Sequence, residues 1–208
     1  MFSHFDIMIM SGKKDAMVNI GGFIALREKR LYDQIKDTNI IYEGFLTYGG
    51  MSGRDMCAMA QGLRESLEFD TLRSRISQVE YLGRQLIKNG IPVQQPIGGH
   101  AVYIDATKFF PNVRRKEFPA QTLALELYLE GGIRGVEIGG IFHGVESSKL
   151  ELVRLAIPRR TYTNNHMDVV VHAAKRIWER RHKVCKGVQI VSQAATMRHF
   201  TIELEYYT

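Results

Sequence analysis

The sequence has 208 residues, of which 45% are hydrophobic and 24% charged, so it can bury a sizeable core and is neither disordered nor fibrous. The net charge is +6, but the basic residues fall in separate groups and form no single stripe, which argues against a nucleic-acid-binding surface. No apolar run is long enough to span a membrane, and no signal peptide is recognisable. The two cysteines have neither metal-ligand spacing nor a disulfide framework. We therefore expect a cytoplasmic protein in which Cys57 is a buried thiol.

The first part of the chain predicts two strands joined by a polar turn. Phe5–Met10 is an apolar run, Ser11–Asp15 is polar, and Met17–Leu26 is a second apolar run interrupted by two glycines. A strand as apolar as the first is typical of a sheet interior, so we expect it to be buried with partners on both edges.

The remaining sequence predicts alternating helices and strands, and hence an α/β fold. Helices are expected at Glu28–Asp37, Arg54–Asn89, Ala120–Glu130 and His166–Arg181, the last with Thr163 as its N-cap. Strands are expected at Val93–Gln95, His100–Asp105, Ile133–Glu137, Glu151–Ile157, Gln189–Ser192 and Arg198–Tyr206. In the last strand an alternating apolar row places His199 on the opposite face. We expect one domain boundary, between residues 1–60 and 61–208, the second part beginning with a bridging helix.

The pair Lys13-Lys14 lies in the predicted turn between the two apolar strands. A lysine that forms a Schiff base must lose its proton near neutral pH, and both desolvation and a neighbouring cation lower a lysine pKa. Lys13 supplies the cation and the strands could supply the low dielectric, while Ser11 and backbone N–H groups could hold a phosphate. The same residues also fit an ordinary solvated turn, and the pattern alone does not decide between the two.

Short motifs along the whole chain resemble those of the tryptophanase and tyrosine phenol-lyase family of β-eliminating lyases, in the same order. They are Met10–Asp15, Val18–Phe23, Tyr48–Gly50, Gly53–Met56, Gly98–Ala101, Phe118–Gln121, Val136–Gly139, Val153–Leu155, Ile157–Arg159, Tyr162-Thr163, His166–Asp168 and Arg198–Thr201. The resemblance implies the C-terminal part of a fold-type I pyridoxal-phosphate (PLP)-dependent, transferase-like enzyme. It would comprise the end of the large domain and the small α/β domain.

The resemblance also implies the cofactor residues. Lys14 is the expected Schiff-base lysine, which later moves protons, and Lys13 and Ser11 are expected around the cofactor phosphate. The backbone carbonyl of Asn19 is expected to bind a monovalent cation, usually K⁺.

The resemblance further assigns substrate residues. Arg154 takes the place that binds the substrate α-carboxylate. A guanidinium suits this role because it grips a carboxylate through two parallel bonds; a surface ion pair is the alternative. Phenol-lyases carry an arginine where this chain has Ile138, in Val136–Ile138, and a phenylalanine where it has His199. Both positions favour tryptophan, cleaved to indole, pyruvate and ammonia, over tyrosine. Asn19-Ile20 and Gly53–Asp55 look more like the phenol-lyases but lie outside the side-chain pocket, and cleavage of tyrosine is the alternative. His199 could instead only pack at a domain interface.

In the resembling family, roughly the first half of the sequence precedes the lysine segment and carries most cofactor contacts. We therefore expect one of three things: a split lyase completed by an N-terminal polypeptide, a catalytically incompetent fragment, or a non-enzymatic scaffold. If the partner half is present, a homo-oligomer is expected, because intact family members are tetramers with active sites shared between subunits.

Overall fold

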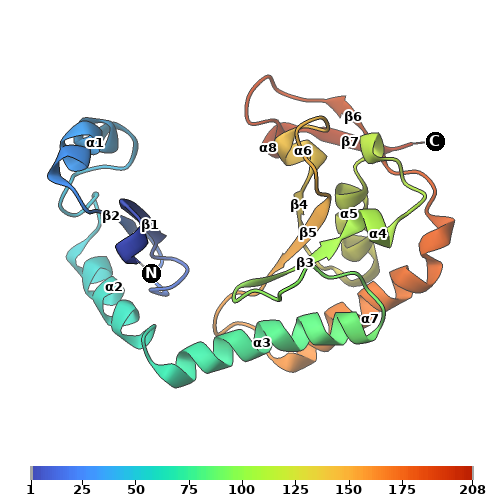
Figure 1. The fold of residues 1–208 in the computed structure, drawn as a ribbon, viewed down its shortest axis with the longest axis horizontal. Coiled ribbons are helices and arrows are strands. Elements are labelled where there is room, and N and C mark those ends of the chain that lie inside the picture. The colour runs from blue at the N-terminus through green and yellow to red at the C-terminus, as the bar shows by residue number, and fades with distance from the viewer. Residues whose placement is uncertain (1, 208) are drawn as a thin grey trace. The chain divides into compact units, whose positions relative to one another are not determined.

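A computed structural model describes residues 2–207, without the side chain of Phe2. The chain divides between Ser74 and Arg75 into two compact units, each with its own internal contacts (Figure 1). The domain boundary predicted between residues 60 and 61 is a different division of the chain and stays a prediction. The two units are described separately below. Among residues 2–207, no helix is both long and apolar enough to cross a membrane.

The first unit is built on a two-stranded antiparallel ribbon. Strands β1 (Ile7–Ser11) and β2 (Gly22–Leu26) pair from Ile7 opposite Leu26 to Ser11 opposite Gly22. The short η1 (Phe2–His4) precedes them, and α1 (Lys29–Tyr42), α2 (Gly53–Glu65) and the start of α3 (Phe69–Lys88) follow. Its small core contains Ala16, Val18 and Met59, which joins the loop between the strands to α2.

Three expectations for this unit are wrong. β1 is exposed, with Ile9 at 76% of its full accessibility, and among residues 2–207 it pairs only with β2. The second strand begins at Gly22 and not at Met17, because the positive φ angles of Met17 (54°) and Gly21 (98°) break the extended backbone. Cys57 is exposed on α2.

The second unit contains a three-stranded antiparallel sheet in the order β3-β5-β4. The strands are β3 (Ala101–Asp105), β4 (Val136–Ile138) and β5 (Leu152–Ala156), and β6 (Val188–Ser192) and β7 (Glu203–Tyr206) form a separate hairpin. The helical elements are α4 (Ala106–Phe109), η2 (Arg115–Glu117), α5 (Pro119–Gly131), α6 (Gly140–His143), α7 (Asn164–Arg180), η3 (Arg181–Lys183) and α8 (Arg198–Thr201).

One apolar core holds this unit together. Val102, Ile104 and Val153 are fully buried on one sheet face, where α5 packs against β4 and β5 and α7 packs against α5. The second half of α3 adds Val79, Leu82 and Leu86 at helical spacing. Thr163 is confirmed as the N-cap of α7, and its backbone N–H donates to Nδ1 of His166 over 3.1 Å.

Other predicted elements of the second half need correction. The long helix predicted over residues 54–89 is two helices, because the chain leaves α2 at Ser66, whose hydroxyl donates to the carbonyl of Leu63. Val93–Gln95 contributes only an isolated bridge, between Val93 and Ile104.

The predicted final strand Arg198–Tyr206 is also wrong at its start. It begins as the helical turn α8, entered through Met197 at φ 55°, and only Glu203–Tyr206 is extended. His199 therefore lies on a helical turn and not on a strand face.

Candidate functional site

The lysine pair lies in a tight loop between β1 and β2. The backbone N–H of Lys14 donates to the carbonyl of Ser11 over 3.1 Å, and that of Gly12 donates to the carbonyl of Gly21 over 2.8 Å. Gly12 is buried, while Ser11, Lys13 and Lys14 are exposed. The loop therefore has a fixed backbone from which an amine, a second cation and a hydroxyl project to the outside.

Two glycines allow the close packing that fixes this loop. A β-carbon at Gly12 would lie 2.9 Å from the side chain of Val18, and one at Gly62 of α2 would lie 1.7 Å from the carbonyl oxygen of Ala16. A side chain at Gly12 would have to displace the Val18 side chain, and one at Gly62 would have to displace the backbone of Ala16. The Lys14 loop is thus held directly against the backbone of α2.

The expected desolvation of Lys14 is not seen. Lys14 is exposed, and the strands on either side of the loop are exposed or half-buried, so they do not bury the lysine. Asn19, the expected cation ligand, is exposed in the same loop. No cluster of His, Cys, Asp or Glu suited to a metal ion occurs within residues 2–207, although this does not bear on a backbone carbonyl site.

Arg154 lies in the central strand of the three-stranded sheet, on the face opposite the apolar core. It lies directly opposite Tyr103 of β3 on one side and Val136 of β4 on the other. Cross-strand partners project from the same face, so the three side chains form a row. The Nε atom of Arg154 is buried and has no hydrogen-bond partner among the described residues. Tyr103 was not predicted as a site residue; its place opposite Arg154 follows only from the strand register.

Ile138 and His199 belong to adjoining segments of the second unit. Ile138 ends β4, and α6 begins two residues later. The His199 ring lies 4.9 Å from the ring of Phe142 in α6, measured between centroids. The side chain of Arg198 donates to the carbonyls of Ile141 (2.9 Å) and Gly140 (2.6 Å). The structure thus attaches the helical turn of His199 to the segment that follows Ile138.

The turn after β4 also contains two buried carboxylates that the sequence analysis missed. Glu137 is 7% exposed and Glu151, at the start of β5, is 2% exposed. Burial and the nearby Glu151 carboxylate raise the pKa of Glu137 to about 7, against the lowering effect of backbone N–H groups. Burial likewise raises the pKa of Glu151. A glutamate in a short strand beside two glycines was the available sequence signal.

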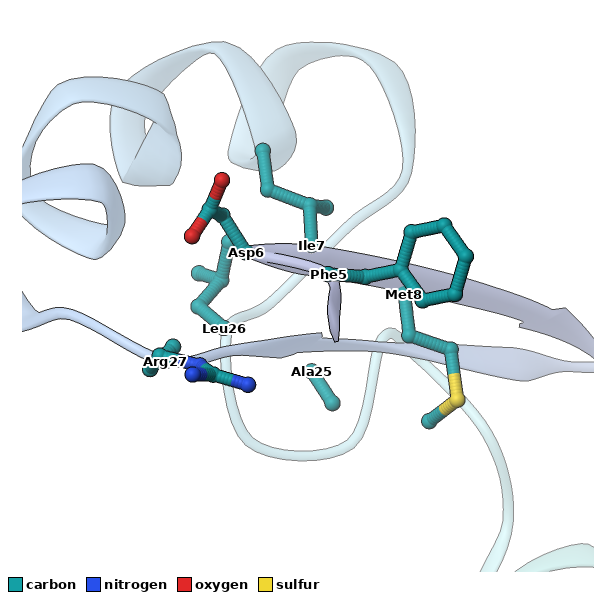
Figure 2. Close-up of a pocket in the computed structure, with 7 residues that line it drawn as sticks. All are labelled: Phe5, Asp6, Ile7, Met8, Ala25, Leu26 and Arg27. Atoms are coloured by element: carbon teal, nitrogen blue, oxygen red, sulfur yellow. The ribbon is translucent and has the colours of Figure 1, made fainter. Parts of the chain in front are cut away.

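The first unit has an open pocket of about 210 Å³ at the outer end of the β1–β2 ribbon (Figure 2). It is lined by Phe5, Asp6, Ile7, Met8, Ala25, Leu26 and Arg27. None of the predicted site residues lines it.

The predicted site residues thus form two groups. Lys14, Lys13, Ser11 and Asn19 share one loop of the first unit. Val136, Ile138, Arg154 and His199 belong to the second unit, around β4 and the segments attached to it. The structure brings residues together within each group.

Comparison with known proteins gives consistent matches along the chain. A family model described as Beta-eliminating lyase matches residues 1–173. A probable beta-eliminating lyase of Trichomonas vaginalis is 55% identical over 99% of this chain and 46% of its own length. A tyrosine phenol-lyase of Intrasporangium calvum is 49% identical over 99% of this chain and 44% of its own length. A probable tryptophanase of Aeropyrum pernix is 45% identical over 99% of this chain and 46% of its own length. The chain therefore spans a little under half the length of these relatives.

Solved structures support the fold. Serine palmitoyltransferases from S. paucimobilis and Sphingomonas wittichii match with TM-scores of 0.57 and 0.58 at 12% and 10% identity. They cover 85% and 86% of this chain, which covers 40% and 41% of theirs. At this identity the likeness shows the fold alone, and it confirms the predicted fold class, an α/β fold like that of the C-terminal part of a fold-type I PLP-dependent enzyme.

Proposed function

Because the chain belongs to the β-eliminating lyase family, we propose that it forms the C-terminal part of a PLP-dependent lyase that cleaves L-tryptophan to indole, pyruvate and ammonia. The observation that carries the proposal is Arg154, whose buried Nε has no hydrogen-bond partner among the described residues and which lies beside the apolar Val136. The activity is assigned to an assembly of this chain with an N-terminal half polypeptide, located in the cytoplasm.

The loop of the first unit has groups that fit the cofactor. Lys14 offers a primary amine, and the exposed Lys13 and Ser11 offer a charge and a hydroxyl for the phosphate on the same turn. When bound, PLP supplies the electron sink that lets bonds at the substrate α-carbon and β-carbon break. Lys14, once released from the cofactor, would carry the proton taken from the α-carbon. The carbonyl of Asn19 would bind K⁺ near this loop.

Arg154 would hold the substrate carboxylate. An unpaired buried guanidinium N–H is costly, and a carboxylate satisfies it through two parallel, charge-assisted bonds. The antiparallel register places Tyr103 and Val136 on either side, so the carboxylate would be fixed at the middle of the sheet face.

Ile138 and His199 would set the preference for the side chain. Ile138 is apolar and half-buried, and it presents no charge to a phenol hydroxyl. The imidazole of His199, half-buried against Phe142, can hydrogen-bond to the indole side of the pocket and help to order it. Both features favour an indole ring over a phenol.

A second candidate is tyrosine phenol-lyase activity, because a relative with that name is 49% identical to the chain. A catalytically incompetent scaffold is the outcome to expect if no N-terminal half completes the cofactor site.

The test combines the chain with an N-terminal half polypeptide cut from the Trichomonas vaginalis relative, in the presence of PLP. Borohydride treatment followed by peptide mass spectrometry should find the cofactor on Lys14, and Lys14→Ala should abolish this label. L-tryptophan should then yield indole and pyruvate in equal amounts, at a higher kcat/KM than L-tyrosine yields phenol. Faster phenol release would favour the second candidate. An unlabelled Lys14 in a folded assembly would contradict the lyase proposal. Gel filtration of the active sample tests the expected oligomer.

A further inference from the structure

Glu137 and Glu151 meet at the backbone of Gly139. A β-carbon at Gly139 would lie 2.8 Å from Oε1 of Glu137 and 2.6 Å from Oε2 of Glu151. Both oxygens therefore lie beside the same glycine, and each carboxylate acts electrostatically within this turn. A side chain at this position would collide with both carboxylates, so the glycine is what allows them to approach the turn.

The two carboxylates are not equivalent. Both oxygens of Glu137 accept backbone N–H groups, Oε1 from Ile141 (3.0 Å) and Oε2 from Phe142 (3.1 Å). Oε1 of Glu151 accepts from Gly140 over 2.8 Å, but its Oε2 is buried without a hydrogen-bond partner among the described residues. In a side chain that is 2% exposed, this is the one carboxylate oxygen of the pair without a hydrogen-bond partner, although the backbone N–H of Ala120 also acts on the Glu151 carboxylate and favours its charged form.

The surrounding charges do not neutralise both groups. Arg198 of α8 acts on Glu137 and Arg115 of η2 acts on Glu151, each favouring the charged form. The guanidinium of Arg198, however, donates to the carbonyls of Gly140 and Ile141. Two ionised carboxylates side by side in a buried site repel each other, and holding one proton between them removes that cost.

We propose that Glu137 and Glu151 share a single proton, carried on Oε2 of Glu151 and donated towards Oε1 of Glu137, and that this bond positions the turn after β4. The turn adjoins Ile138 and carries Phe142, against which His199 packs. The pair is thus a set of positioning residues for the aromatic end of the substrate pocket; this consequence rests on the proposed function.

The raised pKa values agree with this geometry. The pKa of Glu137 lies at about 7 and that of Glu151 is also raised, and two interacting carboxylates lose their protons as a pair. Loss of the shared proton leaves two like charges on either side of Gly139, and the turn would move to separate them. The ring of Phe142, on which the rings of His143 and His199 pack, would report this movement.

The test is a carbon-13 NMR titration of the glutamate carboxyl groups in the full 208-residue chain. We expect one protonation step of the buried pair near neutral pH, accompanied by a shift of the Phe142 ring signals. Titration of both groups below about pH 5, as for ordinary glutamates, would overturn the proposal.

Two amide variants test which of the two glutamates carries the proton. Glu151→Gln places an N–H₂ group where the proton is proposed, so it should preserve the turn and remove the step near neutral pH. Glu137→Gln sets an N–H₂ group against the N–H of Ile141 or Phe142, so it should disturb the turn. Glu146→Gln, at an exposed position between α6 and β5, is the control. Equal disturbance by both buried variants would overturn the proposed location of the proton.

In the active assembly, kcat/KM for L-tryptophan should fall several-fold above neutral pH in the parent chain and stay flat in Glu151→Gln. The NMR measurement needs no turnover. An assembly that shows the shared proton but releases no indole would therefore contradict the proposed function and leave the proton pair standing. An active assembly with the same alkaline loss in Glu151→Gln would contradict the positioning role.

Discussion

The two candidate regions differ in what the described residues provide for them. The Lys14 loop has a fixed backbone, but its functional side chains are exposed and its core consists of Ala16, Val18 and Met59. The Arg154 face is the reverse of a sheet whose other side carries the large core of the second unit. The first unit therefore fixes the backbone around Lys14 but does not give its amine the burial that the proposed Schiff-base chemistry requires. The second unit provides Arg154 with both a fixed strand backbone and buried surroundings.

The strongest way to break this comparison is to remove the fixed backbone of the lysine loop. Gly62→Ala puts a β-carbon 1.7 Å from the carbonyl oxygen of Ala16. We expect it to destabilise the first unit by about 2–3 kcal/mol and to abolish labelling of Lys14. Urea unfolding followed by circular dichroism measures the change. Gly53→Ala, in the same helix with open space around it, is the control. Equal stability of the two variants would show that the loop does not depend on α2.

The second prediction concerns Arg154, whose buried Nε has no hydrogen-bond partner among the described residues. Arg154→Met should lower kcat/KM of the assembly by about 30-fold, equivalent to roughly 2 kcal/mol, because one charged hydrogen-bonding group is lost. The stability of the second unit should hardly change, since Nε has no partner within the described residues. Arg134→Met, at an exposed position before β4, serves as the comparison. A large loss of stability in Arg154→Met would instead indicate a structural role.

The third prediction follows from the raised pKa of Glu137. A raised carboxyl pKa means that the folded chain binds a proton more tightly than the unfolded chain. The free energy of unfolding should therefore fall as pH rises from 4.5, the ordinary pKa of a glutamate, to about 7, and stay lower above that. Allowing for partial solvent access, we expect about 1–2 kcal/mol between the two ends. Urea unfolding at both ends measures it, and Glu151→Gln should flatten the difference. Rising stability over the same range would contradict the assignment.

The smallest effect should come from Ile138, the residue proposed to set the substrate preference. Ile138→Arg should move the ratio of tyrosine to tryptophan cleavage by about tenfold towards tyrosine, because a cation at the end of β4 can meet a phenol hydroxyl. The ratio of phenol to indole released from an equimolar mixture measures it. Val169→Arg, exposed on α7, should leave the ratio unchanged. An unchanged ratio in Ile138→Arg would place that residue outside the pocket.

Hydrophobic periodicity predicted most of the elements of the second unit. Helices α5 and α7 and strands β3 and β5 have apolar faces that meet in one core, so local pattern and final burial agree. The apolar β1 was misjudged for the opposite reason. Apolarity indicates a preference for burial, but burial itself depends on partners, and the described residues supply β1 with only β2.

The site was predictable by residue type and only partly by geometry. The alternating apolar row after His199 predicted a strand, but Arg198 bonds to the carbonyls of Gly140 and Ile141, 58 and 57 residues away, and the chain turns there. Tyr103 and the pair Glu137 and Glu151 were missed because their significance lies in cross-strand register and in contact around Gly139. Neither is encoded in a local pattern.

The contact between Gly62 and Ala16 has a consequence for anyone who wishes to move the Lys14 loop into another protein. The loop and α2 are separate in sequence but share one interface, and the absence of a side chain at Gly62 is part of that interface. A transplant of the lysine motif alone would leave its backbone without support. The smallest transferable piece is therefore the Lys14 loop together with α2, including Gly62.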